Sequence, residues 1–173
     1  MTVRSIAEYL GRHPFFAALD AASVQELAGC ARNEHIPAGQ YLFREGGMAD
    51  HFYVIMHGRI ALELRSPGTG PLVLDTVSNG EVLDWPWLIP PYQWRFDARA
   101  VEPTSVVSLE SACLRAKCDA DPRLGYELIQ RVAQIMSDRL LATRLRLLDL
   151  YGARRPTASD PAGGRTTDSH QHA

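Results

Sequence analysis

The part of this sequence best suited to contact a small molecule is an aromatic stretch from Gly80 to Thr104. It holds all three tryptophans of the chain, Trp85, Trp87 and Trp94, with Tyr92 between the last two. Indole rings offer flat apolar faces on which a planar ligand can stack. Closely spaced prolines exclude a long helix or an unbroken paired strand here. We therefore expect a short crossover between two strands, and crossovers held by a rigid sheet often carry binding sites.

The end of this crossover is predicted to be a strand whose two faces differ. From Trp94 to Ala100, apolar and charged residues alternate with a period of two. Successive side chains of a strand point to opposite faces. Trp94 and Phe96 should therefore share one face, and Arg95 should lie on the other.

The residues that could act in catalysis are scattered along the chain. An active site needs a nucleophile, a base and stabilising donors within reach of one another. The histidines outside the tail fall at separate predicted turns without a paired acid motif: His13, His35, His51 and His57. The sequence also lacks a phosphate-binding loop, a dinucleotide fingerprint and a metalloprotease helix. We predict no catalytic residues and a protein that is not an enzyme.

The cysteines do not form a recognisable pattern. Cys30, Cys113 and Cys118 are an odd count without the spacing of a disulfide framework, which indicates reduced thiols. Cys113 and Cys118 share a predicted helix, a placement that leaves open a redox or metal pair but favours two small buried thiols. His170 and His172 could hold a metal weakly but lack fixed geometry, so we predict no metal site.

Length and charge indicate an ordinary globular protein. The chain has 173 residues, which suits one domain, and its formal net charge of -2 gives no sign of a nucleic acid or anionic lipid as a partner. No apolar run approaches the roughly 20 residues of a membrane helix. The N-terminus lacks the pattern of a signal peptide. We expect a cytoplasmic protein that does not contact membranes.

The spacing of apolar residues divides the chain into three parts. Helical spacing covers residues 2–31, a period of two with frequent turn residues covers residues 35–109, and helical spacing returns over residues 111–151. Short strands at intervals of roughly 8–12 residues are typical of a sandwich or barrel. We predict one domain over residues 1–152 and a disordered tail over residues 153–173, because the tail has almost no large apolar side chains.

The last predicted helix, from about Arg123 to Leu150, is longer than a small barrel needs. Roughly 28 residues at a rise of 1.5 Å span about 42 Å. Its apolar stripe consists of Leu128, Val132, Ile135, Leu141, Leu145 and Leu148. One interpretation is a helix that covers the core and frays at its end. We favour a homodimer in which this helix packs against its symmetry mate.

Four segments occur in an order typical of one family. Residues 39–47 read GQYLFREGG, residues 52–60 read FYVIMHGRI, residues 80–83 read GEVL, and residues 100–104 read AVEPT. Together they resemble the motifs of cyclic-nucleotide-binding domains of the catabolite-activator type. The resemblance covers about Pro14 to Leu148 and implies an α+β fold. That fold is an eight-stranded, antiparallel, jelly-roll-like β-roll with N-terminal helices and a long C-terminal helix.

The resemblance weakens at the residues that hold the ligand in this family. Family members that bind cyclic nucleotides have a Glu for the ribose 2′-hydroxyl and, about ten residues later, an Arg for the cyclic phosphate. Here Trp85 stands at the Glu position, one residue after Asp84. Counting back along the strand puts Trp94 at the Arg position, whereas counting forward puts Arg95 there. Strand parity favours Trp94 inside, although a bulge could turn Arg95 inward.

The predicted pocket is therefore more aromatic than charged. Its residues are Phe43, Val54, Leu72, Leu74, Gly80, Glu81, Leu83, Asp84, Trp85, Trp87, Trp94, Arg95 and Phe96. A buried phosphate without a cationic partner is costly. Either the aromatic rings fill the pocket themselves, or they stack on another small planar ligand. No cofactor is certain, and a cyclic nucleotide stays open.

Two further features bear on function. Many family members carry a helix-turn-helix after the long helix, but nothing after Gly152 resembles one, so we do not expect DNA binding. We predict a regulatory sensor or adaptor, a homodimer, that acts on a separate, unidentified partner protein. The alternative is a genuine cyclic AMP- or cyclic GMP-binding signalling protein with Arg95 on the phosphate. A transcription regulator without a recognisable helix-turn-helix comes third.

Overall fold

The computed structural model describes residues 2–66, 68, 70–83 and 85–152. Helices begin and end the described chain: α1 (Val3–Arg12), the 3-10 helix η1 (Pro14–Phe16), α2 (Ala21–Ala28), α3 (Ser111–Ala120) and α4 (Pro122–Gly152). Between them lie β1 (Ala31–Ile36), β2 (Tyr41–Phe43), β3 (His51–His57), β4 (Ile60–Ser66), β5 (Gly70–Val77), β6 (Asp97–Ala100) and β7 (Thr104–Glu110). The described residues thus form seven strands, where the family resemblance implies eight.

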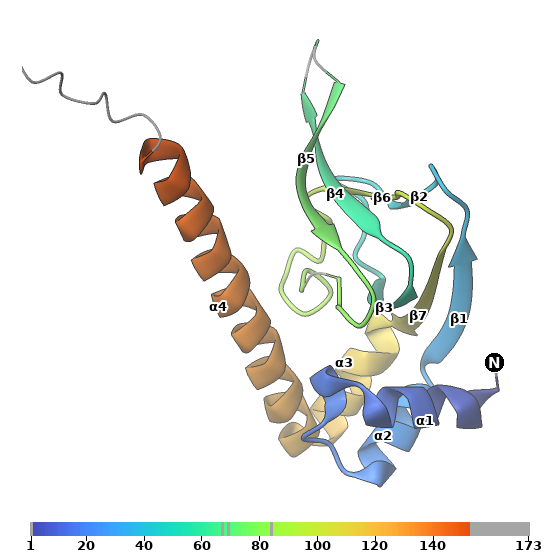
Figure 1. Ribbon diagram of the computed structural model, residues 1–173. Coiled ribbons are helices and arrows are strands. Elements are labelled where there is room, and N and C mark those ends of the chain that lie inside the picture. The colour runs from blue at the N-terminus through green and yellow to red at the C-terminus, as the bar shows by residue number, and fades with distance from the viewer. Residues whose placement is uncertain (1, 67, 69, 84, 153–173) are drawn as a thin grey trace, which may run out of the picture. The chain divides into compact units, whose positions relative to one another are not determined.

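The strands form two antiparallel sheets with the orders β1-β7-β3 and β2-β6-β4-β5. Most neighbours in space are distant in sequence, because β7 pairs with both β1 and β3, and β6 pairs with both β2 and β4. Helices α1, α2 and α3 gather at one end of the sheets (Figure 1). The predicted α+β fold with a jelly-roll-like β-roll is confirmed.

Aromatic packing anchors the N-terminal helices to the sheets. The Phe52 ring on β3 lies 5.1 Å from the Phe15 ring of η1 and 5.4 Å from the ring of Trp87, measured between centroids. The side chains of Thr2 and Asp20 accept backbone N–H groups in the first turns of α1 and α2, which satisfies donors that a helix start leaves unpaired. Helix start signals and buried rings together fix this end of the fold.

The crossover runs from the end of β5 to the start of β6. Gly80 opens it with a φ of 75°, a conformation that glycine adopts without a steric penalty. Strand β6 begins at Asp97, two residues after Arg95, so the observed strand is shorter than the one that the alternation predicts. The parity nevertheless holds, since Trp94 and Ala98 are buried and Arg95 is exposed.

Helix α4 extends across two compact units, Met1–Gln134 and Ile135–Ala173. In the first unit, Leu128 and Val132 are buried in the core. In the second unit, Leu141, Leu145 and Leu148 are 58%, 53% and 64% exposed. The predicted dimer surface is therefore corrected: Leu128 and Val132 already pack within the first unit and are not available to a second chain.

Three sequence predictions depend on which residues the structure describes. Among the described residues, no helix combines the length and apolar composition that crossing a lipid bilayer requires. The tail predicted to be disordered, residues 153–173, lies outside the described residues together with His170 and His172. Asp84 of the predicted pocket also lies outside them.

A disulfide joins Cys30 to Cys113, with 5.8 Å between their Cα atoms. The prediction of reduced thiols is wrong for these two residues, and Cys118 alone is free. Strand pairing brings the two cysteines together: Ala31 pairs with Leu109, and the Glu110 N–H donates to the Cys30 carbonyl at 3.0 Å. Sequence spacing could not reveal this, because the two cysteines are 83 residues apart and meet only through the β1–β7 register.

Candidate ligand pocket

Three stacked aromatic rings lie between the two sheets. The rings of Phe43 and Trp94 are nearly parallel, with 3.6 Å between centroids and 6° between planes. Tyr53 lies 6.0 Å from Phe43 and 6.2 Å from Trp94. Phe43 ends β2 of one sheet and Tyr53 lies on β3 of the other, so Trp94 bridges both layers. Only 2% of Trp94 is exposed, and the indole therefore fills space inside the β-roll.

The backbone holds Trp94 in place on both of its sides. The Trp94 N–H donates to the Gly47 carbonyl at 2.9 Å, and the Trp94 carbonyl accepts the Gly46 N–H at 2.9 Å. One step away, the Ala49 N–H donates to the Tyr92 carbonyl at 2.7 Å. These ladder-like hydrogen bonds fix the direction of the side chain. Moving the Trp94 backbone so that its side chain faces outward would require breaking them.

Trp87 is a second buried indole, in a different environment. Its ring packs on Phe52, and its carbonyl accepts Arg115 Nη1 at 2.6 Å. Its Nε1–H is buried and has no acceptor among the described residues. The guanidinium of Arg115 also lies over the Tyr92 ring, 4.4 Å from the centroid. Trp87 therefore belongs to the packing between the crossover, β3 and α3, whereas Trp85 is only half-buried.

The first part of the crossover pairs with β3. The Gly80 N–H donates to the Ile55 carbonyl at 2.8 Å, and the Leu83 N–H donates to the Tyr53 carbonyl at 2.9 Å. The carboxylate of Glu81 accepts the Ser78 N–H at 2.7 Å and is directed at its own turn. Glu81 is also exposed, so its carboxylate does not point between the sheets.

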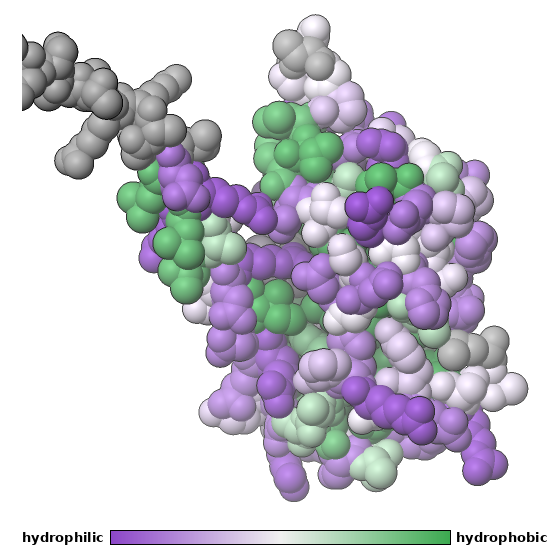
Figure 2. All heavy atoms as spheres, in the orientation of Figure 1, coloured by the Kyte–Doolittle hydropathy of each residue, from purple (hydrophilic) through white to green (hydrophobic). Residues whose placement is uncertain are grey.

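The other predicted pocket residues separate into interior and surface positions. Val54 and Leu83 are fully buried, and Phe96 is half-buried. Leu72 and Leu74 are exposed on β5, which corrects their placement in the pocket. The reason is the sheet order, in which β5 is the edge strand beside β4 only. Figure 2 shows apolar side chains gathered on the surface over β5.

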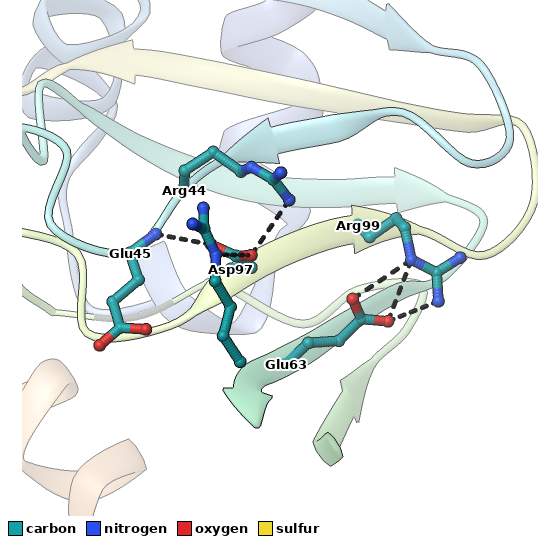
Figure 3. A network of polar contacts seen from close by, with 6 residues as sticks. Arg44, Glu45, Glu63, Asp97 and Arg99 are labelled. Carbon is teal, nitrogen blue, oxygen red and sulfur yellow. Dashed lines mark hydrogen bonds and ion pairs between the residues drawn. The ribbon is translucent and has the colours of Figure 1, made fainter. Parts of the chain in front are cut away.

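Charged residues near β6 form an ion-pair network (Figure 3). The alternation along the chain puts Asp97 and Arg99 on the face opposite Trp94. Glu63 of β4 and Asp97 of β6 are buried and directly opposite in register, a pairing of like charges that is unfavourable alone. Asp97 accepts Arg44 Nη1 at 3.0 Å and Arg65 Nε at 3.2 Å. Glu63 pairs with Arg99. The sequence predicted the outward face of Asp97 and Arg99 but not their partners.

The pKa of Asp97 reflects this network. Burial alone would raise it, but the hydrogen bond from the Glu45 N–H at 2.7 Å and the two arginines outweigh burial and hold the pKa below its ordinary value. The Asp97 carboxylate is therefore ionised and neutralised by Arg44 and Arg65 on the outer face, where Glu63 pairs with Arg99.

The histidines do not converge on a reactive site. The buried His13 caps η1 through Nδ1, which accepts the Phe15 N–H at 3.2 Å, and burial lowers the pKa of its imidazole. His51 lies between Asp50 and Arg32, with ring nitrogens 3.0 Å from each. Among the described residues, no group of three or more His, Cys, Asp or Glu side chains could hold a metal ion. His13 thus has a packing and capping role, and His51 takes part in polar contacts at the surface.

Comparison with known proteins identifies the architecture. A model of the cyclic nucleotide-binding domain family matches residues 33–121. The CRP-like cAMP-activated global transcriptional regulator of Mycobacterium tuberculosis is 22% identical over 143 residues, or 83% of this chain. The chain spans 62% of the length of that relative.

Solved structures agree with this comparison. A candidate cyclic nucleotide-binding protein from Geobacter metallireducens GS-15 superposes with a TM-score of 0.71 at 28% identity, covering 78% of this chain and 97% of the other. The catabolite activator protein of Thermus thermophilus gives a TM-score of 0.64 at 22% identity, with coverage of 80% and 63%. This second likeness concerns the fold alone.

Proposed function

This chain belongs to the cyclic nucleotide-binding domain family, and we propose that within this family it is a sensor or adaptor whose ligand pocket is filled by its own aromatic side chains. The family fold supports a regulatory role. The further steps, an occupied pocket and action through a partner protein, are our proposal. We also propose that the protein is not an enzyme, because the family is regulatory and the histidines are dispersed.

The observation that carries the proposal is the position of Trp94. The indole is buried, stacks on Phe43 and is held by two backbone hydrogen bonds. A cyclic phosphate at this position would have to displace the ring and would not meet the guanidinium of Arg95, because Arg95 is exposed. Burying a phosphate charge without a cationic partner is unfavourable. The position is therefore better suited to the Trp94 ring than to the phosphate of a cyclic nucleotide.

A homodimer through α4 is the assembly we propose. Leu141, Leu145 and Leu148 recur at intervals of four and three residues, the spacing of a helical seam. All three are more than half exposed, which leaves an apolar face without cover in a single chain. Ile135 is half-buried and lies on a different face of the helix from these three leucines, so it does not belong to this seam. We propose that the partner protein, which the adaptor role requires, binds outside this leucine seam.

The proposal is tested by titrating the full chain with cyclic AMP and cyclic GMP. We expect no saturable change in tryptophan emission up to millimolar ligand, and no heat of binding by calorimetry. Saturation at micromolar ligand that is lost in Arg95→Ala would overturn the filled pocket. Arg12→Ala serves as the matched control, because Arg12 is an exposed arginine at the end of α1.

The second candidate is genuine cyclic nucleotide binding. It is favoured by the family match and by the name of the mycobacterial relative, which is described as cAMP-activated. In that case Trp94 would have to move, and Arg95 would have to turn inward to meet the phosphate. The titration above separates the two candidates. Transcriptional regulation ranks third, since it rests only on the name of that relative.

A further inference from the structure

The disulfide between Cys30 and Cys113 lies at a junction of three structural elements. Cys30 follows α2 and directly precedes β1, and Cys113 lies in the first turn of α3. The Cα separation of 5.8 Å falls in the ordinary range for a disulfide, about 5.5–6 Å. Both residues are partly exposed, so a small thiol from solution can reach them. The bond connects the N-terminal helices covalently to the helix that precedes α4.

Without the disulfide, the contact between α2 and α3 is held by weaker interactions. One helical turn from each cysteine, Lys117 and Glu26 form an ion pair at 3.6 Å. The Glu26 side chain is largely exposed, and exposed ion pairs contribute little to stability. Leu114 is buried and keeps α3 near the sheets. Strand pairing and the hydrogen bond from the Glu110 N–H to the Cys30 carbonyl place the start of α3 beside the end of α2. The covalent link adds a constraint within the first turn of α3.

Helix α3 also contacts the crossover, through a residue next to the disulfide. Arg115, two positions after Cys113, donates to the Trp87 carbonyl at 2.6 Å and lies over the Tyr92 ring at 4.4 Å from its centroid. These two contacts hold the middle of the aromatic crossover. A shift of α3 would therefore move Arg115 and disturb its contacts with Trp87 and Tyr92 in the crossover.

We propose that the Cys30–Cys113 disulfide is a redox-responsive tether that fixes α3 and, through Arg115, the aromatic crossover. A thiolate of a small thiol reductant attacks one sulfur, forms a mixed disulfide and releases the other cysteine, which takes a proton. A second thiol then displaces the remaining protein cysteine as its thiol. Two electrons pass from two reductant thiols to the protein disulfide, giving two cysteine thiols and one reductant disulfide. This inference does not depend on the proposed function.

Cys118 does not compete in this reaction. It is five positions from Cys113 on a helix and so projects from a different face. Its side chain is packed close to α4, since a Cβ built on Gly125 would lie 3.2 Å from the Cys118 Cβ. Burial raises the pKa of the Cys118 thiol, which leaves less of the reactive thiolate. Cys118→Ser is therefore the matched control.

The test is hydrogen exchange by mass spectrometry on the full chain, with and without dithiothreitol. Reduction should add two hydrogen atoms to the intact mass. It should also speed amide exchange by about tenfold in residues 111–120 and 85–94, as expected for easier local opening. Cys118→Ser should respond as the wild type does, and Cys30→Ser/Cys113→Ser should exchange fast in both conditions.

Arg115→Ala separates the tether from the link to the crossover. In this variant, residues 85–94 should exchange fast in both conditions, while residues 111–120 should still respond to reduction. Three free thiols in the air-oxidised protein would overturn the proposal, as would unchanged exchange in both segments after reduction. The Arg115→Ala result stays informative if the double cysteine variant fails to fold, because its disulfide is intact.

Discussion

Replacing Trp94 by alanine is the most direct test of the filled pocket. The indole is 2% exposed and stacks on Phe43, so the substitution removes a fully packed side chain and leaves a cavity between the sheets. Core changes of Trp or Phe to Ala cost about 3–5 kcal/mol. For a protein of this length, each kcal/mol lowers the melting temperature by about 2–4 °C. We expect a decrease of about 6–20 °C.

The assays are thermal unfolding for the melting temperature and urea unfolding for the free energy, both followed by far-ultraviolet circular dichroism, because tryptophan emission itself changes in the variant. Trp85→Ala is the control: Trp85 is half-buried and its loss should cost about 1 kcal/mol. A double-mutant cycle with Phe43→Leu isolates the ring stack, which should couple the two sites by about 0.5–1.5 kcal/mol. A Trp94→Ala cost no larger than that of Trp85→Ala, or no coupling to Phe43, would refute the reasoning.

Three further predictions concern other parts of the molecule. Asp97→Asn should destabilise the protein by about 1–3 kcal/mol at pH 7. Because the pKa of Asp97 in the folded protein is below its ordinary value of 3.8, the ionised carboxylate stabilises the fold at pH values above 3.8. This stabilisation is lost as the pH falls through the pKa of the folded protein. The difference in stability between variant and wild type in urea unfolding should therefore shrink as the pH falls below 3.8, and a difference that does not change with pH would contradict the network. Reduction of the Cys30–Cys113 bond, with its sequence separation of 83, should cost up to about 4.5 kcal/mol by loop entropy; an unchanged urea midpoint would contradict this. Leu145→Glu should convert the proposed dimer to a monomer in light scattering at tens of micromolar protein, whereas Leu72→Glu on β5 should leave its mass unchanged. A monomeric wild type would remove the dimer.

The sequence was sufficient to predict most of the strands, because turn residues and a period of two mark them directly. Strand β1 is the exception, since it begins at Ala31, before the predicted start of the β-roll at residue 35. It was also sufficient to predict the inward side chain of Trp94, since parity along the strand before Ala100 depends on local pattern alone. Two adjacent residues, Trp94 and Arg95, were distinguished in this way without any long-range information.

Features that depend on pairing between distant strands could not be predicted. The Cys30–Cys113 bond and the Glu63–Asp97 register both follow from which strands are neighbours. The exposure of Leu72 has the same origin, because alternation cannot tell an edge strand from a central one. The apolar stripe predicted along α4 combines two helix faces, with Leu128 and Val132 on one and Leu141 and Leu148 on the other. Which of the two faces packs in the core depends on the rest of the fold, and the structure buries only the first pair.

The edge position of β5 has a consequence for handling the protein. Leu72, Val73 and Leu74 are consecutive exposed apolar residues beside an edge that no described strand pairs. Such an edge can template intermolecular strand addition, the first step of aggregation. Pro71, which lacks an N–H group, and the charge of Asp75 flank the three residues as gatekeepers. In concentrated samples, aggregation should therefore begin at the β5 edge, and Val73→Lys should reduce it.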